Sequence, residues 1–233
     1  MRNILKKVSI QDMLFPVGVT IIAYIIGGVL HDVIVGFETV RGAEDITVFP
    51  LATLLGIIGY FAFALLAGSV SMTQDFDMIV GLGGTRKEFF AKRLIEIVIA
   101  NAICVATILI LAYFERIKFM HFWTQYELEF DILPYLSMKN MSIAILMTTG
   151  LVFIVSSIIL KFGKTGFWVL WILYMIVCLS MTRIHDLARV LQLDKLAKSI
   201  ASNGGILGLA LIVVSGMLIF ISWLMVRRQA VRV

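Results

Sequence analysis

The sequence predicts an all-α membrane protein with six transmembrane helices and with both termini in the cytoplasm. Hydrophobic residues make up 61% of the 233 positions and charged residues only 15%, whereas about a quarter of the residues of a soluble domain are charged. The charged residues gather in short clusters between long uncharged runs, and the mean hydropathy is +1.01. A water-soluble fold cannot bury so much apolar surface, so lipid is the expected solvent.

Six uncharged runs are each long enough to cross the hydrocarbon core, which takes about 18 residues of helix or more. They lack the alternating pattern of barrel strands, and a helix satisfies its own backbone groups within lipid. No small-residue cleavage site follows the first run, so we expect a retained helix and not a signal peptide. The expected transmembrane helices cover about 13–35, 46–74, 92–115, 140–161, 165–183 and 203–227, within a single membrane domain over 1–233.

The distribution of basic residues predicts the orientation, because cytoplasmic loops are enriched in Lys and Arg. With six crossings, the two termini, the second loop and the fourth loop share one side of the membrane. That side carries 12 of the 20 basic residues and 5 of the 15 acidic ones. We therefore expect it to face the cytoplasm, with the chain in the inner (plasma) membrane. The net positive charge then reflects membrane orientation and gives no reason to expect nucleic-acid binding.

Two further segments have an amphipathic pattern. In Met1–Asp12, the basic residues Lys6 and Lys7 flank a short apolar face. The segment either lies along the inner leaflet before the chain turns into the membrane at Pro16 or is the ordinary positive flank of the first crossing. Residues 183–202 place Leu, Ile and Ala at helical spacing among charged residues. This pattern indicates either an amphipathic helix in the outer leaflet or a solvated helix outside the membrane.

The second loop, residues 75–93, carries the most specific pattern. Phe76, Ile79 and Val80 stand at positions i, i+3 and i+4, which predicts one short apolar helix face before a run of glycines ends that helix. Thr85 and Glu88 then have the spacing of a capping box, so a new helix is expected to start at Thr85. We interpret the loop either as a short transverse helix hinged by glycines, which docks on a partner, or as a plain positively charged hairpin.

The sequence shows no catalytic motif. It contains no HExxH, paired CxxC or GxSxG pattern, and its three histidines are scattered. The glycine-rich string at 81–84 lacks the order G-x-x-x-x-G-K-[ST] that cradles phosphates, so this chain is not expected to bind ATP. We expect it to have no catalytic residue, to hold no metal or cofactor and not to be an enzyme by itself.

With these features the whole chain resembles the permease subunit of type-2 ABC exporters. The resemblance lies in six helices with both ends inside, a basic N-terminal segment, a short second loop and an amphipathic outer segment before the last helix. The stretch from Phe76 to Phe90 is similar to the coupling-helix loop of that family, a small-residue turn followed by basic and aromatic residues. The compact form is similar to bacterial permeases that export amphipathic or antimicrobial peptides.

The resemblance implies a set of partners and contacts. A second permease, identical or homologous, would complete the membrane part, and two cytoplasmic ABC ATPase subunits would hold ATP and magnesium. The N-terminal segment with Lys6 and Lys7 would lie at the interface, and the helix cap at Thr85 and Glu88 would support the docking loop. The residues that would contact the ATPase are Asp75, Phe76, Asp77, Met78, Ile79, Val80, Gly81 and Leu82.

Two other classes of function remain open at the level of the sequence. An ion-coupled secondary transporter needs no ATPase, but it normally carries ionisable residues inside its crossings, and the predicted crossings hold none in their cores. Glu96 stands near the inner end of the third crossing and Asp32 near the outer end of the first, where we expect both to reach water. A membrane scaffold or immunity protein would move no substrate at all. The exporter interpretation is favoured because it accounts for the pattern of the second loop.

Overall fold

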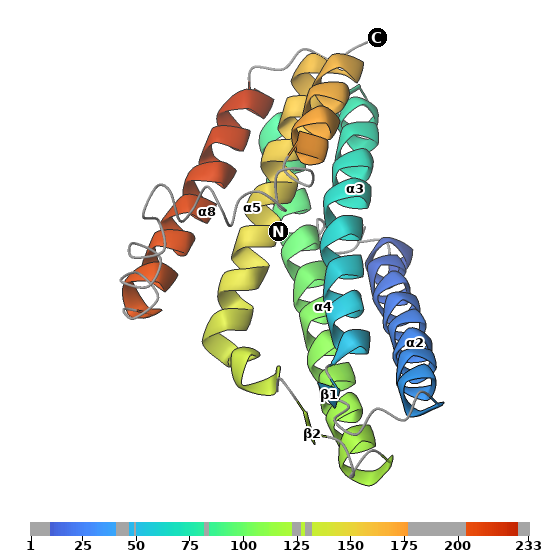
Figure 1. Ribbon diagram of the computed structural model, residues 1–233. Helices are drawn as coiled ribbons and strands as arrows, with labels where there is room; N and C mark the ends of the chain where they lie inside the picture. The colour runs from blue at the N-terminus through green and yellow to red at the C-terminus, as the bar shows by residue number, and fades with distance from the viewer. Residues whose placement is uncertain are drawn as a thin grey trace. The chain divides into compact units, whose positions relative to one another are not determined.

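The computed structural model describes residues 10–40, 47–48, 50–81, 84–122, 127–128, 132–176 and 204–227, and these are almost entirely helical (Figure 1). The long helices are α2 (Ile10–Val40), α3 (Leu51–Gly81), α4 (Arg86–Phe122), α5 (Met138–Phe162) and α8 (Gly204–Arg227), and a shorter helix covers Lys164–Ile176. A 3-10 turn, η1 (Leu133–Tyr135), precedes α5. Two two-residue strands, β1 (Thr47–Val48) and β2 (Glu127–Leu128), pair in parallel.

Five of the described helices are long and apolar enough to cross a membrane. The protein is therefore a multi-pass helical membrane protein, as the composition predicts. The fifth of the six predicted crossings, 165–183, is described only as the helix Lys164–Ile176, and residues 177–183 lie outside the described part. The amphipathic outer segment 183–202 also lies outside it, and the cytoplasmic location of the termini stays a prediction.

The helices α3 and α4 are longer than the hydrophobic runs that predicted them. We expected crossings at 46–74 and 92–115, whereas α3 has 31 residues that end at Gly81 and α4 has 37 residues that begin at Arg86. Charged residues bounded the predicted runs, but a charge does not end a helix; it only marks where the helix leaves lipid. The separate transverse helix predicted at 75–82 is therefore wrong in this respect, because residues 75–81 are the last two turns of α3.

The first helix also differs from its prediction. Residues 1–9, with Lys6 and Lys7, lie outside the described part, and residues 10–12 already belong to α2. We expected the chain to turn into the membrane at Pro16, but α2 runs through this residue without a break. The Thr20 hydroxyl donates a hydrogen bond of 2.9 Å to the Pro16 carbonyl within the same helix.

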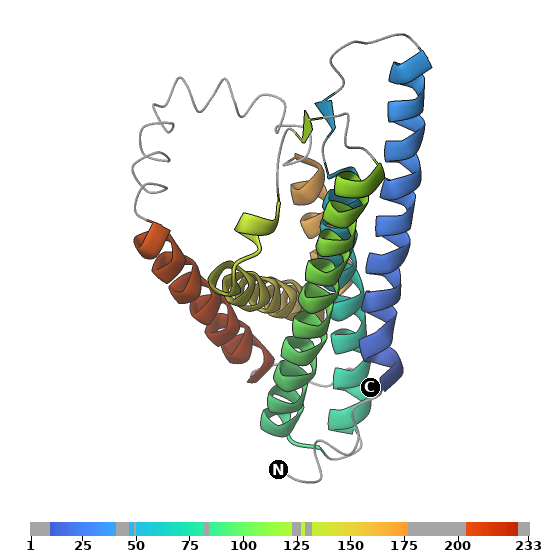
Figure 2. The same cartoon turned by 90° about the horizontal axis from the view of Figure 1, so that it is seen from below.

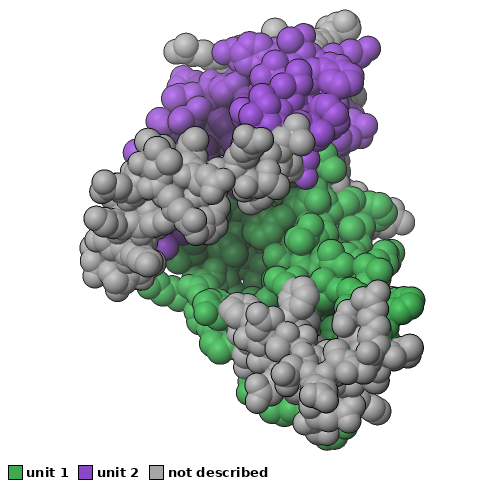
Figure 3. All heavy atoms as spheres, in the orientation of Figure 1, with its two compact units in different colours: residues 1–67, 92–148 green, residues 68–91, 149–233 purple. Residues whose placement is uncertain are grey.

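Two compact units make up the chain (Figure 3). Unit 1 combines residues 1–67 with 92–148, and unit 2 combines residues 68–91 with 149–233. The division falls within α3, α4 and α5, each of which is a continuous helix. Each unit is described below by itself.

In unit 1, α2 packs closely against the first half of α3 through small residues (Figures 1 and 2). A Cβ atom added at Gly27 would lie 2.7 Å from the Ala52 Cα, and one added at Gly59 would lie 2.7 Å from the Ala23 Cβ. Neither distance leaves room for a side chain. Lipid tails are as apolar as leucine, so membrane helices associate by close packing, which small residues permit.

In unit 2, α5 and α8 meet through another set of small residues. A Cβ atom added at Gly150 would lie 3.2 Å from the Ser215 carbonyl oxygen. Two turns after Gly150 in α5, the hydroxyl of Ser157 is hydrogen-bonded to that of Ser222 in α8. The Ser222 hydroxyl also lies 2.9 Å from the Phe153 carbonyl, to which it donates. Hydroxyls buried between two membrane helices in this way satisfy each other where water is absent.

Candidate functional site

The turn between α3 and α4, in unit 2, is built from local contacts. The Gly84 N–H donates to the Ile79 carbonyl at 2.9 Å, and an added Cβ at Gly84 would lie 2.7 Å from that oxygen. The Thr85 hydroxyl accepts the Glu88 N–H at 3.2 Å, and the Thr85 carbonyl accepts the Phe89 N–H at 3.0 Å. The Thr85 hydroxyl therefore lies at the N-terminal end of α4, where the spacing predicts a cap. Among the described residues, this hydroxyl contact is the half of the capping box that forms.

Aromatic side chains brace the same turn. The Phe76 ring at the end of α3 meets the Phe89 ring at the start of α4, with centroids 5.3 Å apart and planes at 79°. Phe76 is 0% exposed and Phe89 is 1% exposed. Phe90 lies against Phe153 of α5 and Trp223 of α8, with centroid distances of 4.8 and 5.1 Å. The turn is therefore fixed to its own unit by rings as well as by hydrogen bonds.

These contacts divide the predicted docking segment into buried and exposed positions. We expected Phe76, Ile79 and Val80 to form an exposed face, but Phe76 is fully buried and the other two are half-buried. The spacing of apolar residues defines a helix face but does not say which neighbour covers it. The exposed positions are Met78, whose side chain is 56% exposed, and Gly81. Asp75 and Asp77 are half-buried, and Leu82 lies outside the described residues.

Unit 2 brings together three segments that the predicted topology assigns to one side of the membrane. The Arg86 guanidinium, at the start of α4, donates to the carbonyl of Arg227, the last residue of α8, at 3.4 Å. Thr73 and Asp77 of α3 line one cavity with Gly163 and Lys164, which lie in the predicted fourth loop. The second loop, the fourth loop and the end of the last helix are therefore neighbours.

Charged residues are buried near the start of α4. Glu96 is 9% exposed and Arg93 is 5% exposed. The Arg93 guanidinium lies 2.9 Å from one Glu96 carboxylate oxygen, and the Lys92 ammonium lies 3.5 Å from the other. We expected Glu96 to reach water, and this expectation is wrong. Two basic side chains on the same helix neutralise its charge, which lowers the cost of placing it away from water.

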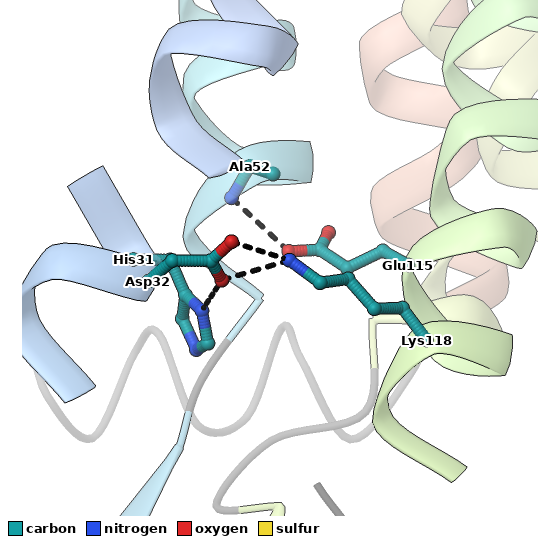
Figure 4. Close-up of polar contacts among 5 residues, drawn as sticks. All are labelled: His31, Asp32, Ala52, Glu115 and Lys118. Carbon is teal, nitrogen blue, oxygen red and sulfur yellow. Dashed lines mark hydrogen bonds and ion pairs between the residues drawn. The ribbon is translucent and has the colours of Figure 1, made fainter. Parts of the chain in front are cut away.

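A second polar cluster lies in unit 1, where α2, α3 and α4 meet (Figure 4). Its centre is Glu115 of α4, which is 4% exposed. One carboxylate oxygen accepts the Ala52 N–H at 3.1 Å, and the other accepts the Thr53 N–H at 2.9 Å together with the Thr53 hydroxyl. Ala52 and Thr53 are the second and third residues of α3, so their N–H groups have no acceptor within that helix. Glu115 therefore caps α3 from another helix.

An ion pair joins α2 to α4 beside this cap (Figure 4). The Lys118 ammonium lies 2.7 and 2.8 Å from the two Asp32 carboxylate oxygens, and the His31 Nδ1 lies 3.2 Å from one of them. The His31 ring is buried against the edge of Phe119, with centroids 5.3 Å apart. Asp32 and Lys118 are partly exposed, with side chains at 46% and 39%, so water still screens the pair.

Sequence reasoning missed Glu115 because it only marked the end of an apolar run. One signal was present, however. The residue before α3 is Pro50, and no Ser, Thr, Asp or Asn stands there to accept the first N–H groups of the helix. A helix that begins in an apolar environment without its own cap needs an acceptor from elsewhere. The pattern indicates that need but not which residue meets it.

Within the described part of the chain, no group of three or more His, Cys, Asp or Glu side chains is placed to hold a metal ion. Comparison with known proteins gives no further guide, since no family model, no curated protein and no solved structure matches the chain.

Proposed function

We propose that this chain is the membrane-spanning permease subunit of an ATP-driven exporter and that a separate cytoplasmic ATPase supplies the energy. The observation that carries the proposal is the length and bracing of the α3–α4 turn. The 31 residues of α3 extend about 46 Å at 1.5 Å per residue, whereas the hydrocarbon core is about 30 Å thick. About three turns of α3 therefore lie outside the core, and a soluble partner can reach those at the C-terminal end.

A projecting turn transmits force only if it is stiff. The cap at Thr85 fixes the first turn of α4, and the Phe76–Phe89 contact holds the ends of the two helices together. Phe90 links the same turn to α5 and α8 through Phe153 and Trp223. A displacement applied to this turn would move the neighbouring parts of four helices of unit 2 together, because closely packed side chains have low compressibility and transmit strain.

The exposed end of α3 supplies the surface that we assign to the ATPase. Met78 is its largest exposed side chain, and Ile79 and Val80 are partly exposed beside it. A methionine side chain is flexible and polarisable, so it can fill an irregular partner cleft. The adjacent basic residues that begin α4 add a positive rim around this apolar centre, an arrangement that is common in protein interfaces.

The resemblance extends the proposal to the assembly and the substrate. A second permease, identical or homologous, would complete the membrane part, and two ATPase subunits would bind ATP and magnesium. The substrate we expect is amphipathic or hydrophobic, with a peptide favoured, and it would move outward.

One observation favours the competing class, an ion-coupled carrier. Glu96 and Glu115 are both buried, and buried carboxylates in membrane helices are often part of proton or ion pathways. Each of them is already engaged, however, Glu115 by three donors and Glu96 by two cations. A relay group must exchange its partner during transport, so we rank this function second.

The test is the substitution Met78→Asp, with Met138→Asp as its matched control. Met138 is 81% exposed at the start of α5, in a predicted outer segment. The tagged chain is purified from its native membranes, and the copurified subunit is assayed for ATP hydrolysis. We expect Met78→Asp to reduce the bound ATPase about tenfold or more and Met138→Asp to leave it unchanged, because burying a carboxylate at the centre of an interface removes a dominant contact.

Two results would argue against the proposal. One is a wild-type chain that carries no ATPase but whose transport in proteoliposomes is abolished by proton ionophores, which would assign it to the ion-coupled class. The other is full ATPase retention by Met78→Asp. Phe76 is unsuitable for this test, because a charge at this buried position would disturb the fold itself.

A further inference from the structure

A cavity in unit 2 is lined by two groups of opposite charge and by an apolar wall. It has a volume of about 330 Å³, and its lining residues are Thr73, Asp77, Ile159, Leu160, Gly163, Lys164 and Phe167. We infer that this cavity binds the headgroup of an amine-bearing zwitterionic phospholipid, with the lipid ammonium at Asp77 and the lipid phosphate at Lys164. The inference does not depend on an ATPase partner.

The two charged residues of the cavity are not paired with each other. Asp77 and Lys164 line the same space, yet neither forms an ion pair with any residue in the part of the chain that the structure describes. Opposite charges that face a common cavity without contact leave room for a ligand that carries both charges. A zwitterion satisfies both groups at once, whereas a simple anion or cation satisfies one and is repelled by the other.

The hydrogen-bonding groups agree with this polarity. Thr73 and Asp77 are four residues apart on α3, so they lie on the same helix face. The Thr73 hydroxyl donates its proton to the Val70 carbonyl at 2.7 Å, so its oxygen remains an acceptor. The α3 side of the cavity therefore offers acceptors to an ammonium, and Lys164 on the other side offers only donors, which suit a phosphate. A quaternary ammonium has no N–H to give to these acceptors, so a primary amine fits them better.

The position of the cavity favours a lipid over a soluble zwitterion. Thr73 and Asp77 follow the apolar part of α3, and Lys164 follows the end of α5, so the cavity lies where two membrane helices leave the hydrocarbon core. Ile159, Leu160 and Phe167 supply an apolar wall that suits the start of an acyl chain. Phe167 leads into an exposed aromatic run with Trp168 and Trp171, residues that are enriched at membrane interfaces.

The turn that shapes the cavity is itself tightly built. Gly163 has a φ of 61°, a conformation that residues with a side chain rarely adopt, and its N–H donates to the Ile159 carbonyl at 2.7 Å. A Cβ added at Gly166 would lie 2.8 Å from the Ile158 carbonyl oxygen, so the helix after the turn folds closely back on α5. The turn therefore fixes the backbone of Lys164 next to the apolar wall.

The experiment measures lipid retention by the full-length chain. The protein is purified in a neutral detergent and mixed with equal amounts of phosphatidylethanolamine, phosphatidylcholine and phosphatidylglycerol that have the same acyl chains. Bound lipids are then counted by native mass spectrometry. We expect phosphatidylethanolamine to be retained about tenfold over the other two, the ratio that one charge-assisted hydrogen bond supplies.

Three substitutions separate the roles of the two charges. Asp77→Asn should lower phosphatidylethanolamine to the level of phosphatidylcholine without lowering phosphatidylglycerol. Lys164→Gln should lower phosphatidylethanolamine and phosphatidylglycerol together, and Lys164→Arg should retain the wild-type preference. The matched control is Lys87→Gln, which removes an exposed lysine near the α3–α4 turn that does not line the cavity. It should change nothing.

Three outcomes would overturn the inference. Equal retention of the three lipids by the wild type would mean that the cavity only meets bulk lipid. A wild-type preference that survives both Asp77→Asn and Lys164→Gln would place the lipid elsewhere. Free phosphoethanolamine is added as a further arm at the same concentration as the lipid, and complete displacement of the lipid by it would assign the cavity to a soluble zwitterion instead. Neither substituted side chain has an ionic partner among the described residues, and an unchanged melting temperature verifies that each variant is folded.

Discussion

The helices α3 and α4 are capped in opposite ways at their N-termini. α4 is capped by Thr85, the residue directly before it, on an exposed surface. α3 is capped by Glu115, a buried carboxylate that lies 62 to 63 positions away along the chain. The first arrangement decides where a helix begins. The second also decides which helices lie together, because the same side chain satisfies one helix while it belongs to another.

The two caps also differ in strength. A hydrogen bond to a charged group contributes about 1.5 to 3 kcal/mol, whereas a hydroxyl cap contributes about 1 kcal/mol. Glu115 accepts bonds from three donors away from water, and its negative charge lies at the positive end of the α3 dipole. The Thr85 hydroxyl accepts one bond at the surface, where water can replace it. The remote cap should therefore dominate the stability of the pair.

The substitution Glu115→Ala should have the largest effect. It leaves the N–H groups of Ala52 and Thr53 without an acceptor, and we expect it to reduce the free energy of unfolding by about 3 kcal/mol. Unfolding of the detergent-solubilised protein, followed by circular dichroism, measures this change. Glu115→Gln keeps the shape and one acceptor, so its effect should be smaller. A loss below about 1 kcal/mol for Glu115→Ala would make the remote cap no stronger than the local one.

The substitution Thr85→Ala should have an intermediate effect, with a loss of about 1 kcal/mol. Because the Glu88 N–H is exposed to solvent in this variant, water takes the place of the lost hydroxyl. The same unfolding measurement applies, and Thr85→Ser, which retains the hydroxyl, is the control. If Thr85→Ala proved as costly as Glu115→Ala, burial would not be what distinguishes the two caps.

The smallest effect is expected from the ion pair beside the remote cap. Asp32→Asn and Lys118→Met, made singly and together, should give a coupling free energy of about 0.2 to 1 kcal/mol, because both side chains are partly exposed. Raising the salt concentration should reduce this coupling further. A coupling free energy larger than the loss of unfolding free energy caused by Glu115→Ala would show that the ion pair, and not the cap, contributes most to the stability of these helix contacts.

The comparison shows which features the sequence can predict. The cap at Thr85 was predicted, because the Thr85 hydroxyl, the Glu88 N–H and the glycines before them are neighbours in the chain. The membrane character was predicted as well, because composition alone requires it. Gly27 and Gly59, small residues of the kind that permits close helix packing, lie where α2 and α3 approach each other closely.

Features that depend on distant neighbours were not predicted. The helical spacing of Phe76 was identified correctly, but its burial depends on Phe89, whose ring reaches it only after the chain reverses at Gly84. Glu96 was assigned to water because it stands near the inner end of the predicted third crossing, whereas Lys92 and Arg93 of the same helix form ion pairs with it. The C-terminal ends of α3 and α4 were placed too early, because the ends of the uncharged runs were taken as the ends of the helices.

The cap of α3 by Glu115 also has a consequence for synthesis. Ribosomes add about 5 to 20 residues per second, so Glu115 emerges roughly 3 to 12 s after Thr53. α3 is complete at Gly81, which is about halfway through this interval, and until Glu115 is added the first N–H groups of α3 lack that acceptor. The cap of α3 therefore forms only after α4 has been made. A ribosome that stalls between the codons of Thr53 and Glu115 would leave a chain in which the N-terminus of α3 lacks its cap.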